Sequence, residues 1–252
     1  MSHLKRFKII IEYEGTHYLG WQKQKHFPNT IQETIEDAIH AFAQQRVEVF
    51  GSGRTDSGVH AIGQVAHFDL DFSHKSYETD KIKAAINAHL LDKKISILKI
   101  EEIHSDFHAR HDAKQRSYKY VILNRYSPPT FNKNIVTHIK YPLDVSKIKR
   151  VSKLLIGTHD LTSFRAADCQ AKSPVKTIDE INITQEGELI IFHIKARSFL
   201  YNQIRNMVGT FCKISTGKWP TSKMQEILEA KDRTKAGPTA PPQGLFFLEA
   251  TY

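Results

Sequence analysis

Hydrophobic and polar positions along the first hundred residues predict a run of alternating strands and helices. Residues 7–13 form a continuous apolar segment typical of a buried strand, and residues 30–45 carry apolar side chains at helical spacing. Thr30 and Glu33 match a capping box, which predicts where this helix begins. The other elements predicted here are strands at 47–50, 64–72 and 95–103 and a helix at 81–91.

A second run of the same kind begins near residue 106. It contains predicted strands at 116–124, 176–183 and 188–195 and predicted helices at 144–157 and 198–217. Residues 231–244 are rich in proline and glycine, and we expect an ordered loop or a lid there. The element order favours an α+β fold with helices on one face of a mixed sheet, in two domains, 1–105 and 106–252.

The charge of the chain narrows the class of partner. The 252 residues include 36 Lys and Arg against 27 Asp and Glu, for a net charge of +9. Basic side chains gathered on one face release the counterions condensed on nucleic acid, so a polyanionic partner is the simplest explanation. A generally basic surface without a special partner is the alternative on charge alone.

The cysteines and the hydropathy of the chain indicate in which cellular compartment the protein is expected. Cys169 and Cys212 lie far apart and form no CxxC pair, which is typical of a reducing environment and argues against a zinc ribbon. No apolar run approaches the roughly 18 residues of a membrane span, and the first strand begins too early for a signal peptide. We therefore expect a cytoplasmic protein.

The stretch GSGRTDSGVHA, residues 51–61, carries the first candidate chemistry. It lacks the GK[ST] ending of a P-loop, and its glycines do not match GxGxxG opening a helix. One interpretation is an Asx-type turn in which Asp56 bonds its own backbone. The other is a loop that presents a reactive carboxylate, because an aspartate of ordinary pKa, about 3.9, is ionised at neutral pH and can act as a nucleophile. Arg54 precedes this carboxylate and His60 follows it.

Other polar and aromatic residues leave similar alternatives. Tyr118 and Tyr120 fall on one face of a predicted strand, either as core residues or as a platform that stacks a base. Arg205 lies off the apolar stripe of its helix and by itself resembles an ordinary exposed arginine. The scattered histidines, His104 and His108 among them, do not match a metal-binding spacing, so we interpret them as surface or RNA-facing residues.

Six segments in the same order resemble the tRNA pseudouridine synthase A family. GRTDSGVHA resembles the family signature GRTDAGVHA. The other five are YEGTHYLGWQKQ, FHARHDAKQRSYKYVI, GTHDLTSFRA, SFLYNQIRNMVG and GPTAPPQGLFFLEATY. Together they run from residue 13 to residue 252, so the resemblance covers nearly the whole chain.

This resemblance implies an isomerase that converts uridine to pseudouridine in the anticodon stem-loop of tRNA, at positions 38, 39 and 40. It implies a homodimer that works without cofactor or metal. The implied fold is a pair of ferredoxin-like, RRM-related α+β domains with a mainly antiparallel central sheet and a basic cleft between them.

The same resemblance assigns roles to individual residues. Asp56 matches the nucleophile, Tyr118 the tyrosine that stacks on the base, and Arg54 the arginine that accompanies the flipped nucleotide. Arg205 matches the helix arginine that pairs with the catalytic carboxylate. Arg110 of FHARHDA and His60 of GRTDSGVHA are expected to bind substrate as well.

Several positions depart from the family pattern, and two other functional classes of protein remain as alternatives to the isomerase. The departures are Ser57, His111, Asp112, Leu161 and Gln203, none of which is an assigned site residue. One rival is a tRNA-binding or RNA-chaperone module of the same fold that has lost catalysis. The other is a metal-dependent RNA hydrolase, which the lack of a ligand cluster in the sequence disfavours.

Overall fold

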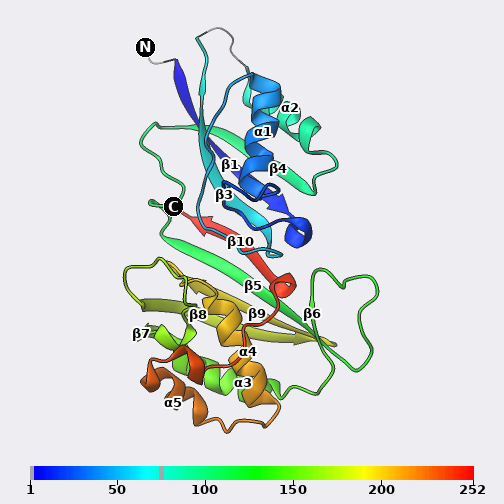
Figure 1. Ribbon diagram of the computed structural model, residues 1–252, viewed down its shortest axis with the longest axis vertical. Helices are drawn as coiled ribbons and strands as arrows, with labels where there is room; N and C mark the ends of the chain where they lie inside the picture. Colours follow the sequence, from blue (N-terminus) through cyan, green and yellow to red (C-terminus); the bar gives the residue numbers. More distant parts are fainter. Residues whose placement is uncertain (1–2, 74–76) are drawn as a thin grey trace. The chain divides into compact units, whose positions relative to one another are not determined.

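The chain divides into two compact α+β units (Figure 1). The computed structural model describes residues 3–73 and 77–252. The first unit comprises Met1–Lys114 with Phe246–Tyr252, and the second comprises Gln115–Leu245. Each unit has a mainly antiparallel sheet and helices, so the predicted α+β class is confirmed. Within the described ranges no helix is long and apolar enough to cross a membrane.

The sheet of the first unit is built around its first strand. β1 (Leu4–Tyr13) lies between β4 (Ile95–Ile103) and β3 (His60–Asp71) and is antiparallel to both. β10 (Leu245–Thr251) pairs parallel to β3, so the last strand of the chain completes this sheet. The short β2 (Phe50–Gly51) pairs antiparallel with β3.

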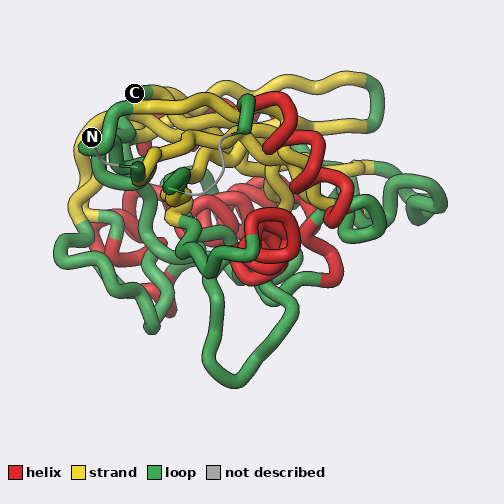
Figure 2. The backbone as a smooth tube through the Cα atoms, turned by 90° about the horizontal axis from the view of Figure 1, so that it is seen from above, coloured by secondary structure: helices red, strands yellow, loops and turns green. Residues whose placement is uncertain are grey.

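Two helices, α1 (Ile31–Ala43) and α2 (Thr79–Leu90), belong to this unit, and α2 packs on β4; helices are red and strands yellow in Figure 2. The Thr30 side chain accepts a hydrogen bond from Glu33 N at 3.3 Å, which confirms the predicted start of α1.

The strand predicted at 47–50 is wrong except at Phe50, which belongs to β2. Val49 N donates instead to the Glu36 carboxylate at 3.1 Å, so a helix side chain satisfies it.

The second unit contributes four antiparallel strands, in the order β5, β9, β8, β7. These strands span Gln115–Asn124, Leu189–Ala196, Val175–Glu186 and Gly157–Asp160. A short strand, β6 (Thr137–Ile139), pairs parallel to β5.

The helices of the second unit are α3 (Val145–Ser152), α4 (Gln203–Ser215) and α5 (Lys223–Ala230). Phe211 of α4 stacks on Phe192 of β9 with the rings parallel and 6.0 Å apart, which places α4 on the sheet. The predicted helix at 198–217 begins late because Asn202 has a left-handed backbone (φ 60°) that stops helical continuation before it. α3 likewise ends before residue 157, and the pattern did not predict α5.

The loop at 231–244 is ordered and packs directly on α4. Gly237 N donates to Thr210 Oγ1 at 2.8 Å. A Cβ added to Gly209 would lie 1.7 Å from the Pro238 carbonyl oxygen, so this helix position has room only for glycine. The order of this loop therefore depends on close backbone contact rather than on its own composition.

Candidate active site

The glycine-rich loop between β2 and β3 forms a tight turn at the candidate carboxylate. Val59 N donates to the Asp56 carbonyl oxygen at 3.1 Å, and Gly58 between them has φ of 77°, a conformation that glycine adopts without strain. Ser57 Oγ donates to the Tyr18 carbonyl oxygen at 3.0 Å. The Asp56 side chain is half-buried, so the turn holds it partly open to solvent.

Thr55 anchors the loop from inside the unit. Its carbonyl oxygen accepts from Trp21 N at 3.0 Å, and its hydroxyl shares a 2.8 Å hydrogen bond with the Tyr13 hydroxyl. Burial raises the pKa of Tyr13 to about 12, so this phenol keeps its proton at neutral pH. A Cβ on Gly20 would lie 2.6 Å from the Thr55 carbonyl oxygen, so the YLGW segment touches the loop directly. These contacts explain why two distant sequence motifs form one structure.

Gln64 holds the other end of the loop and escaped the sequence reasoning. Its Nε2 donates to the Gly53 carbonyl oxygen at 2.9 Å, and its Oε1 accepts from Ser52 Oγ at 2.7 Å. Gln64 is completely buried. Its polar side chain at the start of the mainly apolar stretch QVAHF is the signal that could have identified it, because buried amides need partners.

Two arginines share the surface beside this turn. Arg54 and Arg110 are both exposed. The pKa of Arg54 is lowered, first by partial burial and then by the positive charge of Arg110. Two neighbouring guanidinium groups can donate together to one phosphate, so the pair is suited to binding a phosphate.

His60 occupies a different environment from the one expected for a substrate ligand. It is 1% exposed, its Nδ1 accepts from Gly15 N at 3.1 Å, and its ring stacks on Phe246 at 4.8 Å. This imidazole supports the base of the loop, and direct contact with substrate stays a prediction.

The two remaining predicted site residues belong to the second unit. Tyr118 on β5 is 8% exposed, with its ring edge-to-face on Phe199 at 5.1 Å. Arg205 on α4 is half-buried, unlike the exposed arginine that the helix pattern predicted. Its Nε donates to the Ala240 carbonyl oxygen at 2.7 Å and its Nη1 to Asn202 Oδ1 at 2.8 Å. Both side chains are therefore held in defined orientations.

Comparison with known proteins gives a family for this arrangement. The family model described as tRNA pseudouridine synthase matches residues 9–112 and 151–252, which include every predicted site residue except Tyr118. The chain belongs to the tRNA pseudouridine synthase family. A relative named tRNA pseudouridine synthase A from Ehrlichia canis (strain Jake) is 47% identical over 98% of this chain and 100% of its own length.

Two other relatives carry the same name. The protein from Rhodospirillum rubrum is 45% identical over 98% of this chain and 87% of its own length. The protein from Wolbachia pipientis wMel is 46% identical over 98% of this chain and 100% of its own length. The resemblance noted in the six sequence motifs is thereby confirmed.

Within this pseudouridine synthase, the two tyrosines of RSYKYVI have separate surroundings. Tyr120 is completely buried, and its hydroxyl pairs with Thr137 Oγ1 at 2.6 Å and donates to the Pro241 carbonyl oxygen at 2.8 Å. Of the two interpretations, core residue or base-stacking platform, Tyr120 is therefore the core residue. Arg116 is also buried, and its Nη1 donates to the Arg197 carbonyl oxygen at 2.6 Å.

Gln203, another departure from the family pattern besides Ser57, has a structural explanation. Gln203 stands where the family carries methionine, and it is 1% exposed. Its Oε1 accepts from Leu200 N at 2.8 Å, so the amide satisfies a main-chain donor just before α4.

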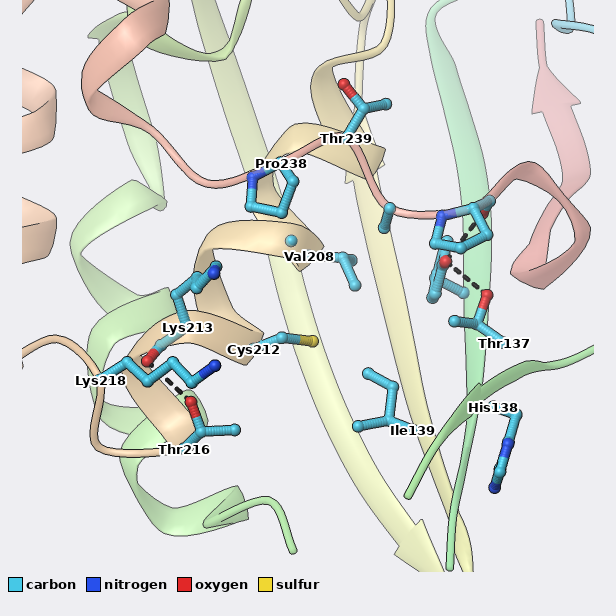
Figure 3. Close-up of a pocket in the computed structure, with 14 residues that line it drawn as sticks. Thr137, His138, Ile139, Val208, Cys212, Lys213, Thr216, Lys218, Pro238 and Thr239 are labelled. Atoms are coloured by element: carbon cyan, nitrogen blue, oxygen red, sulfur yellow. Dashed lines mark hydrogen bonds between the residues drawn. The ribbon is translucent and has the colours of Figure 1, made fainter. Parts of the chain in front are cut away.

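A cavity of about 260 Å³ lies beside the segment that holds Arg205 (Figure 3). Its lining includes Cys212 and Val208 of α4, Ile139 of β6 and the segment 238–241. Burial raises the pKa of the Cys212 thiol to about 12, so this sulfur is protonated at neutral pH and is not a nucleophile. In the part of the chain that the structure describes, no three His, Cys, Asp or Glu side chains are grouped to hold a metal ion.

Proposed function

We propose that this chain isomerises uridine to pseudouridine at positions 38, 39 and 40 of tRNA, with Asp56 as the catalytic carboxylate. The single observation that carries the proposal is the anchored turn in a member of this isomerase family. Asp56 stands half-buried at its apex, while Thr55 and Ser57 on either side of it are hydrogen-bonded to the body of the unit. A turn anchored on both sides keeps a reacting group in place without further ordering on binding.

The chemistry needs few groups because the product is an isomer of the substrate. The N1–C1′ bond breaks, the uracil rotates, and a C5–C1′ bond forms; N1 gains a proton and C5 loses one. The Asp56 carboxylate either attacks the sugar or base covalently or assists elimination to a glycal, and both routes give the same product. Nothing is oxidised or reduced.

Tyr118 and Arg205 are proposed as substrate-site residues of the second unit. Tyr118 stacks on the uracil after it leaves the helical stack, a step that costs a few kcal/mol. The support for this role is a ring already oriented by Phe199, which lowers the entropy lost on binding. Arg205, which the family pattern pairs with a carboxylate, is supported by the two hydrogen bonds that orient its guanidinium.

We further propose a cytoplasmic homodimer. The segment 125–141 carries large aromatic side chains whose exposure to water is unfavourable in a monomer. The exposed fractions are 85% for Tyr126, 97% for Phe131 and 59% for Tyr141. Contact with a second copy of the chain would cover such side chains.

Mapping pseudouridine on unmodified tRNA transcripts tests the proposed reaction. After carbodiimide labelling, primer extension should stop one nucleotide 3′ of positions 38, 39 and 40 wherever these are uridine, and replacing each uridine by cytidine should remove its stop. A transcript that remains unmodified at all three positions, or is modified only elsewhere, would show the proposal to be wrong.

The affinity for tRNA should fall steeply with salt. Each phosphate contact contributes about 0.9 to the slope of log Kd against log salt concentration. Replacing Arg54 or Arg110 by glutamine should therefore lower the slope by about 1, whereas Arg46→Gln, an exposed arginine paired with Asp37, should leave it unchanged. Fluorescence anisotropy between 50 and 250 mM KCl measures these slopes, and an equal slope in all three variants contradicts the assignment.

A further inference from the structure

Two buried or half-buried imidazoles hold three consecutive main-chain amides next to the catalytic loop. Ala109 N donates to His67 Nδ1 at 3.2 Å. Arg110 N and His111 N both donate to His108 Nδ1, at 3.1 and 3.4 Å. The backbone that carries Arg110 lies outside any helix or strand and is held in part by these two imidazoles, together with the Asp112 carboxylate, which accepts from His108 N at 2.7 Å.

The rings can do this only while their Nδ1 atoms are unprotonated. Burial, followed by the charges of Arg6 and His108, lowers the pKa of His67 to about 4, although Asp69 and Asp112 act in the opposite direction. Burial and the charge of His111 lower the pKa of His108 as well, against the opposing charge of Asp112. Both rings are therefore neutral at neutral pH, so their Nδ1 atoms can accept the hydrogen bonds from the three amides at that pH.

An exposed aromatic ring lies on this frame. Phe50 of β2 stacks on His67 with centroids 5.1 Å apart and an angle of 19°, yet 38% of its surface is exposed. His108 lies 5.7 Å from Phe50, and His111 lies 4.2 Å from His108. One face of the phenyl ring is thus supported from behind, and the aromatic surface continues across two imidazoles.

Positive charge borders this surface. Arg110 belongs to the amide-held segment itself, and its charge acts on Arg54, two residues before Asp56. An exposed phenyl ring, with two tilted imidazoles and two guanidinium groups beside it, matches the chemistry of an unpaired nucleotide, which offers a base to stack and a phosphate to bind.

We propose that Phe50, His108 and His111, together with Arg110, form a second nucleotide-binding subsite, which stacks one unpaired base of the tRNA and holds its phosphate. The subsite takes a nucleotide other than the isomerised uridine, and it rests on the proposed function in that the RNA is tRNA. His67 is a positioning residue, since it supports Phe50 and the Ala109 amide without reaching the surface.

A thermodynamic cycle between protein and RNA tests the subsite. Phe50→Ala should raise the Kd for unmodified tRNA about tenfold, and Phe50→Trp should retain the affinity, because stacking needs only an aromatic face. Single abasic nucleotides are then scanned through the anticodon stem-loop. At one position the abasic substitution should weaken binding of the wild type but not of Phe50→Ala, since the two changes remove the same contact.

Leu98→Ala, which truncates an exposed apolar side chain on β4, is the matched control and should leave Kd unchanged. Phe50→Leu keeps apolar packing against His67, so equal loss in the Leu and Ala variants ascribes the effect to stacking and not to unfolding. Additive effects at every nucleotide, or equal loss in Phe50→Trp, would overturn the proposal. An unchanged Kd together with a shift in oligomeric state by light scattering would overturn it in favour of a contact between copies of the chain. A wild type that binds tRNA but forms no pseudouridine would refute the proposed function alone, because the cycle measures binding and not turnover.

Discussion

Replacing Asp56 by asparagine should abolish pseudouridine formation, with a loss of at least about 10³-fold in kcat/KM. The amide has nearly the same shape as the carboxylate, so the turn closed by Val59 N and the Asp56 carbonyl oxygen should persist. What disappears is the negative charge and the nucleophilic oxygen. Affinity for tRNA should be equal or higher, because a charge that repels phosphate is removed. Primer-extension mapping and anisotropy on the same protein sample measure both quantities.

The control for this substitution is Asp92→Asn, an exposed carboxylate in the turn between α2 and β4 that should leave activity unchanged. Asp56→Ala should be as inactive as Asp56→Asn, which makes the conclusion independent of the reactivity of the new amide. Turnover above about one per cent of the wild type in both variants would remove Asp56 from its assigned role. Loss of tRNA binding in both would instead assign it to substrate recognition.

Gly209→Ala should destabilise the second unit by about 2–3 kcal/mol and also lower activity. A Cβ at this position would lie 1.7 Å from the Pro238 carbonyl oxygen, so the helix and the segment must separate. The same segment continues to Ala240, whose carbonyl oxygen accepts from Arg205 Nε. Displacement of the segment should therefore reach the proposed substrate arginine as well as the stability. Urea unfolding gives the stability, and initial rates at saturating tRNA give the effect on turnover.

Gly187→Asn is the matched control for this glycine. Gly187 lies in the turn between β8 and β9, nothing lies within 4 Å of an added Cβ, and its φ of 59° is one that asparagine tolerates. It should cost less than about 1 kcal/mol and leave the rate unchanged. Equal stability of the two variants would show that α4 and the segment at 238–241 can separate freely, contrary to the close contact described above.

Prediction from the sequence succeeded where one residue pattern had one structural solution. The apolar stripe of α1 and its Thr30 cap belong to this class, because helical periodicity and capping act over a few neighbouring residues. Prediction was wrong where distant groups decided the outcome. Val49 lies in a sequence typical of a strand, yet its main-chain amide donates to the Glu36 carboxylate of α1. The start of α4 depended on a left-handed backbone at Asn202, which no periodicity reveals.

The candidate site divides in the same way. Asp56 and Arg54 could be assigned from a motif because the motif is contiguous, and their roles stay predictions. Gln64 and Tyr13, which hold the loop in place, were missed because their function consists of contacts with residues far away in the chain. His60 stands within the motif, yet its burial gives it a supporting position that its place in the sequence did not suggest.

By itself, then, the sequence determined the α+β class, the basic charge and the order of the motifs, from which the family follows. These properties are local or summed over the chain, and they do not depend on which residues meet. Only the tertiary structure decided that Thr55 anchors the GRTDSGVHA turn and that two imidazoles hold the amides of residues 109–111. It also decided that Phe50 remains exposed on that frame. Each of these depends on polar groups satisfied across long sequence separations, which burial requires and local pattern does not specify.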